Sequence, residues 1–283
     1  STAELVLSGI KIQIDSVFNQ GTVVRAQLKN LQAVQQDGLT LTSMQADVVM
    51  DTTETSVHGA YIRTQNSWLD LNVQTDTDVG HLLQQEPLTV NLKGTIGLAD
   101  VLPFYPDVPH EIRRQKVNIN TAFTVTGKRL QMGQLILDMP GHFKITGSGS
   151  LSSWQDMKRM KGTFILRGEL PDVTFAQSFL GKQGVHIPRH IDLLTRLKAD
   201  RGSWDAFMRM CCGQGCLTLD GVYKIPLQDY DAALSLNNFP LDQFLPADSL
   251  GKVTASVRLS GQDFSWQKAR AEVNAHIREC WYR

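Results

Sequence analysis

Apolar and polar residues alternate along many segments of this chain. Most second positions are Val, Ile, Leu or Phe, and the positions between them are mostly Thr, Asn, Gln, Ser or charged. Because successive side chains of a β-strand point to opposite faces of a sheet, this pattern predicts strands with one apolar and one polar face. The clearest examples are residues 10–14, 69–73, 88–92, 117–125 and 253–259.

Turn signals separate these segments along nearly the whole chain. Long helical periodicity is absent, so a βαβ arrangement is not expected. We therefore predict a mainly β chain: an elongated, curled antiparallel sheet, β-groove or taco-like, with a few short helices. The turn signals fall at residues 19–21, 36–38, 127–128, 140–141, 220–221 and 260–261.

One stretch, residues 188–212, is helical in character. Pro188 can occupy a first helical turn, and Ile191, Leu194 and Leu197 are three residues apart, as on one face of a helix. Ser203 could begin a second short helix as its N-cap. We expect a helical insert here that either covers part of the sheet or forms a surface connection.

A weak internal repeat is also present. Residues 97–106, 170–180 and 238–246 each form a short apolar element with one Asp, after one alternating segment and before another. The repeat favours a stacked, elongated sheet. We expect residues 1–283 to be one continuous β-rich segment of a longer chain.

Composition narrows the classes of function. Lys plus Arg number 28 and Asp plus Glu number 28, so the formal net charge is zero. A nucleic-acid-binding protein would normally carry a clustered basic excess, so nucleic acid is not an expected partner. No apolar run reaches the roughly 18 residues that a membrane-spanning helix needs. We read the chain as a piece whose targeting signal or anchor lies outside it.

No set of residues supports catalysis. Gly147-Ser148-Gly149 lacks the spacing of a nucleophile elbow. His186 and His190 have a spacing that two metal ligands on a helix can use, but Pro188 lies between them. Asp70, Asp76 and Asp78 are better explained as polar strand or turn residues than as a calcium site. We therefore expect that the chain is not an enzyme and that it binds neither a metal ion nor a cofactor.

The four cysteines leave their redox state open. Adjacent Cys211 and Cys212 rarely pair with each other, and four cysteines are too few for a disulfide scaffold. Free thiols, a disulfide between Cys212 and Cys216, and a disulfide between Cys216 and Cys280 are the alternatives.

Many of the predicted strands have one apolar face, and few helices are predicted to cover these faces. Large apolar faces must be shielded from water, so the sheet forms a sandwich, a barrel, or a groove that shields its own lining. A groove would suit acyl chains or an apolar strand of a partner. Its expected lining residues are Ile119, Phe123, Val125, Leu135, Leu137, Leu234, Leu236, Val253, Val257 and Leu259.

The C-terminal part carries a family resemblance. Residues 230–262 contain an alternating strand, a short Leu-Asp-Gln-Phe-Leu-Pro element at 241–246, and the strand Gly-Lys-Val-Thr-Ala-Ser-Val-Arg-Leu-Ser-Gly at 251–261. Residues 269–277 resemble the strand that follows. This pattern resembles the AsmA-like/TamB family, most closely its Bacteroidetes members. The best match covers residues 216–278, with similar units at 90–103 and 164–180.

The resemblance implies both a place and a role. Members are anchored by one inner-membrane helix, extend through the periplasm of Gram-negative bacteria, and have a curled sheet with an apolar interior. They are implicated in phospholipid transport to the outer membrane and in protein assembly or secretion there. It therefore implies phospholipid acyl chains as partners. An outer-membrane barrel assembly protein would be reached through another part of the chain. The lipid or client and the direction of transport stay open.

Two other classes of protein remain as alternatives. One is a surface-exposed β-sandwich binding module without a transport role, in which the apolar faces pack on each other. The other is a β-rich carbohydrate-active enzyme, which would need carboxylates clustered on one surface.

Overall fold

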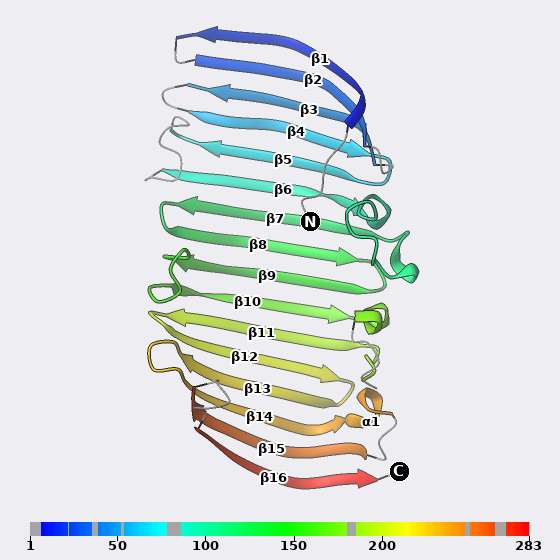
Figure 1. The fold of residues 1–283 in the computed structure, drawn as a ribbon, viewed down its shortest axis with the longest axis vertical. Helices are drawn as coiled ribbons and strands as arrows, with labels where there is room; N and C mark the ends of the chain where they lie inside the picture. Colours follow the sequence, from blue (N-terminus) through cyan, green and yellow to red (C-terminus); the bar gives the residue numbers. More distant parts are fainter. Residues whose placement is uncertain are drawn as a thin grey trace. The chain divides into compact units, whose positions relative to one another are not determined.

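The chain is built almost entirely from antiparallel β-strands in a computed structural model (Figure 1). The predicted fold class, mainly β with a curled antiparallel sheet and a few short helices, is confirmed. The structure describes residues 7–21, 23–35, 39–51, 54–77, 86–179, 185–246, 250–263 and 270–282. The turn expected at residues 36–38 and Asp78 lie outside these ranges.

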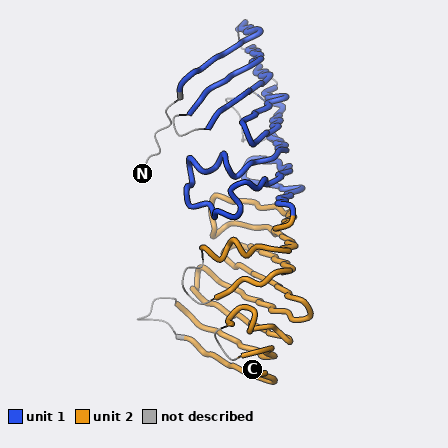
Figure 2. The backbone as a smooth tube through the Cα atoms, turned by 90° about the vertical axis from the view of Figure 1, so that its right-hand side faces the viewer, with its two compact units in different colours: residues 1–140 blue, residues 141–283 orange. Residues whose placement is uncertain are grey.

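Two compact units divide the chain at residue 140, and Figure 2 colours them separately. Unit 1 (residues 1–140) contains β1 (Leu7–Gln20), β2 (Val23–Gln35), β3 (Thr40–Met50), β4 (Thr55–Thr64), β5 (Trp68–Thr75), β6 (Pro87–Gly97), β7 (Lys116–Thr126) and β8 (Arg129–Met139). Unit 2 (residues 141–283) contains β9 (Phe143–Ser152), β10 (Lys161–Leu170), β11 (Ile191–Asp200), β12 (Ser203–Cys212), β13 (Gly215–Lys224), β14 (Asp229–Pro240), β15 (Leu250–Gln262) and β16 (Arg270–Tyr282).

The strand order follows the sequence from β1 to β16. Several neighbours are joined by two-residue turns. One such turn, Arg201-Gly202, joins β11 and β12, and its two residues have φ of 50° and 85°. Positive φ at both central residues is the signature of the type I′ turn, whose twist matches that of the flanking strands.

The helical insert expected at 188–212 is wrong, because β11 and β12 occupy most of this range. β11 pairs with β10 along its whole length, and β12 pairs with β13. These ladders satisfy the backbone polar groups on both edges of β11 and β12, which outweighs a weak helical pattern. Ser203 starts β12 after the turn instead of capping a helix.

Two expected turns are also wrong. Asp220-Gly221 lies within β13, and Ser260-Gly261 lies within β15. Both dipeptides are turn signals only when the chain reverses there, and here each strand continues with its pairing intact. In contrast, turns do follow β7 and β8 at residues 127–128 and 140–141, and of the turn expected at 19–21 only Gly21 lies beyond β1.

The three repeat elements mark the places where a short helix follows a strand. The 3₁₀-helix η2 (Leu98–Asp100) follows β6, η4 (Thr174–Phe179) follows β10, and the single-turn helix α1 (Leu241–Phe244) follows β14. A further 3₁₀-helix, η3 (His110–Ile112), lies between η2 and β7. A helical element therefore recurs at intervals of four strands.

Candidate functional site

Each unit has one face made almost entirely of apolar side chains. Residues directly opposite each other on antiparallel strands point to the same face, so the register identifies the members of a face. In unit 2, Leu217 of β13 lies opposite Met210 of β12 and Leu236 of β14. The next row along these strands holds Met208, Leu219 and Leu234.

The five lining residues predicted in unit 2 all lie on this face. Leu234 is opposite Val257, and the register places Leu236, Leu259 and Val253 on the same side as these two. Val253 is buried, and the other four are half-buried. Their neighbours on β16 include Val273 and Ile277, which are 61% and 67% exposed.

The five lining residues predicted in unit 1 also share one face. Ile119 is opposite Leu137, and Thr121, between Ile119 and Phe123 on the same face, is opposite Leu135. Phe123 and Val125 lie opposite Val90 and Leu88 of β6. All five are half-buried. The structure thus brings each predicted set together on one face of its own unit.

Several apolar residues of the unit-2 face were missed by sequence reasoning, because residues 188–212 were read as helical. Period-two alternation was the signal that could have identified them. It places every second residue of each strand on the face, starting from Ile191 in β11 and from Trp204 in β12. The missed residues are Leu193, Leu197, Ala199, Trp204, Ala206, Met208 and Met210.

One end of the unit-2 face is closed by a cap, which we define as residues 171–179, 185–190 and 241–246. Phe244 of α1 stacks on Phe239 of β14, with ring centroids 4.9 Å apart. The His186 amide donates a hydrogen bond to the Phe244 carbonyl at 2.7 Å, which joins two segments of the cap. Beneath the cap, Phe239, Ile191 and Cys212 are buried. The cap therefore provides unit 2 with a small core at this end.

In unit 1, Asp100 connects the 3₁₀-helix η2 to the sheet by hydrogen bonds. Its carboxylate accepts hydrogen bonds from the Thr64 hydroxyl, from the Ser67 hydroxyl at 2.5 Å and from the Asn66 side-chain amide at 2.8 Å. Burial raises the pKa of Asp100, but the hydrogen bonds from Ser67, Thr64 and Asn66 lower it by more, so its pKa lies below the usual value. The carboxylate thus links η2 to the β4–β5 turn.

Asp100→Ala is expected to lower the free energy of unfolding by about 2 kcal/mol at neutral pH, because several charge-assisted hydrogen bonds are lost together. The folded-state pKa is depressed, so this stabilisation is present above the unfolded-state pKa and disappears as the pH falls through the folded-state pKa. Urea titrations from pH 7 downward measure the difference from wild type. Asp172→Ala is the control.

Asp172 occupies the corresponding repeat position in unit 2 but has fewer partners. It accepts hydrogen bonds from Thr174 and forms a partly exposed ion pair with Arg189 at 3.0 Å. Exposed pairs contribute little, so its substitution should cost less than about 1 kcal/mol. Equal losses for the two substitutions, or a difference for Asp100→Ala that does not shrink in acid, would contradict the anchoring role.

The opposite face of unit 2 is polar. It carries exposed ion pairs such as Arg258–Asp231 at 2.9 Å and Lys198–Asp205 at 3.7 Å. It also carries a disulfide between Cys211 and Cys216, which lie opposite each other on β12 and β13. The disulfides considered from the sequence, Cys212–Cys216 and Cys216–Cys280, are not formed. The register of the β12–β13 hairpin places Cys216 opposite Cys211 instead.

The remaining cysteines are free. Cys212 is buried on the apolar side, and this burial, with a smaller contribution from Asp192, raises the pKa of its thiol. Cys280 is half-buried on β16. Within the described ranges, no three His, Cys, Asp or Glu residues come close enough together to hold a metal ion.

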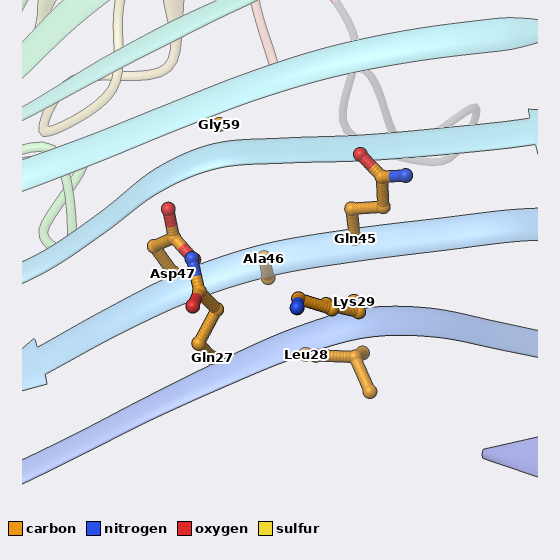
Figure 3. A pocket seen from close by; sticks show the side chains of 7 residues that line it. All are labelled: Gln27, Leu28, Lys29, Gln45, Ala46, Asp47 and Gly59. Carbon is orange, nitrogen blue, oxygen red and sulfur yellow. The ribbon is translucent and has the colours of Figure 1, made fainter. Parts of the chain in front are cut away.

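A small polar hollow in unit 1 arises from irregular strand pairing. It has a volume of about 170 Å³ and lies where the β2–β3 ladder is interrupted between Leu28 and Ala33 (Figure 3). Gln27 and Asp47 lie opposite each other along its wall. Lys29, also in the lining, is paired with Asp15 at 2.6 Å. We assign no ligand to this hollow, because the interrupted ladder accounts for it.

The fold and its surfaces define a class of structure: antiparallel sheets in chain order, with one apolar and one polar face. No known family model, curated protein or solved structure matches the chain. Within the part of the chain that the structure describes, no helix is both long and apolar enough to cross a membrane.

Proposed function

We propose that the apolar face of each unit binds phospholipid acyl chains. In this proposal the chain is a segment of a periplasmic protein of the AsmA-like/TamB type, anchored to the inner membrane by a segment outside it. The protein acts in phospholipid transport to, or protein assembly at, the outer membrane. The observation that carries the proposal is the unbroken set of apolar rows, such as Met208–Leu219–Leu234–Val257.

The chemistry of these rows suits acyl chains. Each buried methylene contributes roughly 0.8 kcal/mol, whatever the lipid headgroup, so an apolar face can hold different lipids without specific polar contacts. The described residues of each unit form a single sheet, whereas a β-sandwich needs two facing sheets within one core. The half-buried side chains of the face therefore have surface left for a ligand.

The Cys211–Cys216 disulfide supports the proposed compartment. Disulfides persist in oxidising environments such as the bacterial periplasm and are rare in the cytosol. This bond lies on the polar face, at the end of the β12–β13 hairpin, and takes no part in the proposed lipid surface.

Photocrosslinking in cells tests lipid binding. A photoreactive amino acid at Val257 or Phe123 should capture phospholipid, because both positions are on apolar faces. Ser256 and Thr124 are matched controls, since each is the chain neighbour of a test position and points to the opposite face. Mass spectrometry of the purified adducts should find lipid several times more often at the test positions. Equal capture at all four positions, or none at Val257 and Phe123, would refute the proposal.

A further inference from the structure

A row of small residues crosses the apolar face of unit 2. Ala206 of β12 is opposite Gly221 of β13, and Gly221 is opposite Ala232 of β14. We call this row the slot floor. It ends on β15 at Leu259, which is opposite Ala232. Because neighbouring strands are about 4.8 Å apart, the row from β12 to β15 is about 14 Å long.

Large side chains line both sides of the slot floor. Trp204, Tyr223 and Tyr230 form an aromatic row on one side, each opposite the next. The row Met208–Leu219–Leu234 forms the other side. Each row is two residues along its strand from the floor, so about 7 Å separates it from the floor.

The structure has a hollow at this place. Its volume is about 280 Å³, its exposed lining is apolar, and its lining residues include the aromatic row, the slot floor and Leu259. Ala206 is exposed, so the floor is open to a ligand. A long, narrow and apolar hollow that crosses the strands has the shape of one alkyl chain.

Cations lie at the strand ends next to the aromatic row. Arg201 is in the turn before Ser203, which is one residue from Trp204. Lys158 belongs to the loop that contacts this turn: the Arg201 amide donates to the Met160 carbonyl at 2.9 Å. Among the described residues, neither of these two basic side chains has an ion-pair partner. We call them the basic edge (Figure 1, left ends of β10 to β12).

Most other charged side chains near the basic edge form ion pairs with each other. Lys161 pairs with Asp200 at 3.7 Å, and Arg159 pairs with Asp156 at 3.5 Å. Asp229 is opposite Lys224 in the register, and both are on the polar face of the sheet. Among the described residues near these turns, Arg201 and Lys158 outnumber the one further carboxylate, Asp263, whose amide donates to the Gln228 carbonyl at 3.1 Å. This balance favours an anionic group.

Exposed apolar side chains accompany these cations. Trp154 and Met157 are in the same loop as Lys158, and Leu227 is in the β13–β14 turn. The Ile225 amide donates to the Gly202 carbonyl at 2.8 Å, which holds this turn against the β11–β12 turn. Mixed aromatic, apolar and basic side chains are typical of surfaces that meet lipid headgroups.

We propose that the slot floor holds one acyl chain of an anionic phospholipid, with its headgroup at the basic edge. This proposal rests on the proposed function and adds to it a position and a headgroup preference. The chain lies across β12 to β15, between the aromatic row and the Met208–Leu219–Leu234 row. The headgroup phosphate then lies near Arg201 and Lys158.

Binding of two lysophospholipids with the same acyl chain tests this assignment. The probes are lysophosphatidylglycerol and lysophosphatidylcholine, measured with the full chain by calorimetry below the micelle concentration. Gly221→Leu fills the slot and should weaken binding of both probes about tenfold, because several methylene contacts are lost. A side chain fits there, since a Cβ on Gly221 would lie 3.6 Å from the Ala232 Cβ.

Two further variants and a control complete the design. Ala206→Leu fills the slot from an exposed position and should act like Gly221→Leu, which guards against a folding defect in either one. The double variant Arg201→Gln with Lys158→Gln should weaken lysophosphatidylglycerol about fivefold and leave lysophosphatidylcholine unchanged. Thr218→Leu, on the polar face of β13, should leave both affinities unchanged.

The outcomes separate the two proposals. If wild type binds neither probe and Val257 and Phe123 capture no lipid, both proposals fail. If wild type binds both probes but Gly221→Leu and Ala206→Leu bind them equally well, the slot is overturned and the proposed function stands. If the slot variants weaken binding but the double variant changes neither probe, the anionic preference is overturned.

Discussion

Phe239→Ala is expected to lower the free energy of unfolding of unit 2 by about 3–4 kcal/mol. The Phe239 ring is 3% exposed and stacks on Phe244, so alanine removes apolar contacts and leaves a cavity under the cap. The cap depends on this contact because α1 has only four residues and cannot form a stable helix alone. Urea unfolding followed by circular dichroism measures the loss.

The same substitution at Phe207 is the matched control. Phe207 is in unit 2 but lies half-buried on the polar face, where Arg196 sits 5.3 Å from the ring centroid. Phe207→Ala should cost about 1 kcal/mol, less than half the loss at Phe239. Similar losses at the two positions would mean that the cap does not form a core. Hydrogen exchange should show loss of protection at His186 in Phe239→Ala only, since the His186 amide bonds to the Phe244 carbonyl.

Gly94→Ala is expected to destabilise unit 1 by about 2–3 kcal/mol. A Cβ on Gly94 would lie 2.3 Å from the Trp68 carbonyl oxygen and 2.9 Å from the Leu69 Cα. Both atoms belong to the backbone of β5, so β5 or β6 must move. Gly94 is also opposite Ile119, which means that the shift would disturb the apolar face. Chemical unfolding of purified variants gives the difference.

Gly133→Ala in β8 supplies the comparison for Gly94→Ala. A Cβ at Gly133 meets nothing within 4 Å, and its φ is not in the left-handed region. Alanine there restricts the unfolded chain and should be neutral or stabilise by up to about 1 kcal/mol. If Gly94→Ala is also neutral, the close approach of β5 and β6 at Gly94 is wrong.

Alternation was enough to predict most strands and the shared faces. Ile119, Phe123 and Val125 are separated by even numbers of positions, so any strand through them puts all three on one side. The same reasoning puts Val257 and Leu259 on one side of β15, and the register has them there. These inferences need only the pleat of a strand.

Residues 188–212 carry the same alternation, but three residues obscure it. Leu194 and Phe207 are apolar residues on the polar face, and Thr195 is a polar residue on the apolar face. They break the alternation and create the three-residue spacing of a helix. Pairing with β10 and β13 decides the structure, and such tertiary contacts are invisible in a local pattern.

Properties that depend on register were equally out of reach. The Cys211–Cys216 disulfide exists because Gly213-Gln214 forms the turn and places the two cysteines opposite each other. The slot floor depends on the alignment of Ala206, Gly221 and Ala232 from three strands. A one-residue slip would separate each set and move side chains to the other face.

Strand order that follows the sequence has a consequence for how the protein folds. Each ladder joins segments that are neighbours along the chain, as β12, β13 and β14 show, so the loops that must close are short. Low contact order favours rapid folding, and no strand has to wait for a distant segment. A polypeptide that emerges gradually, N-terminus first, during synthesis can therefore add one strand at a time to a growing edge.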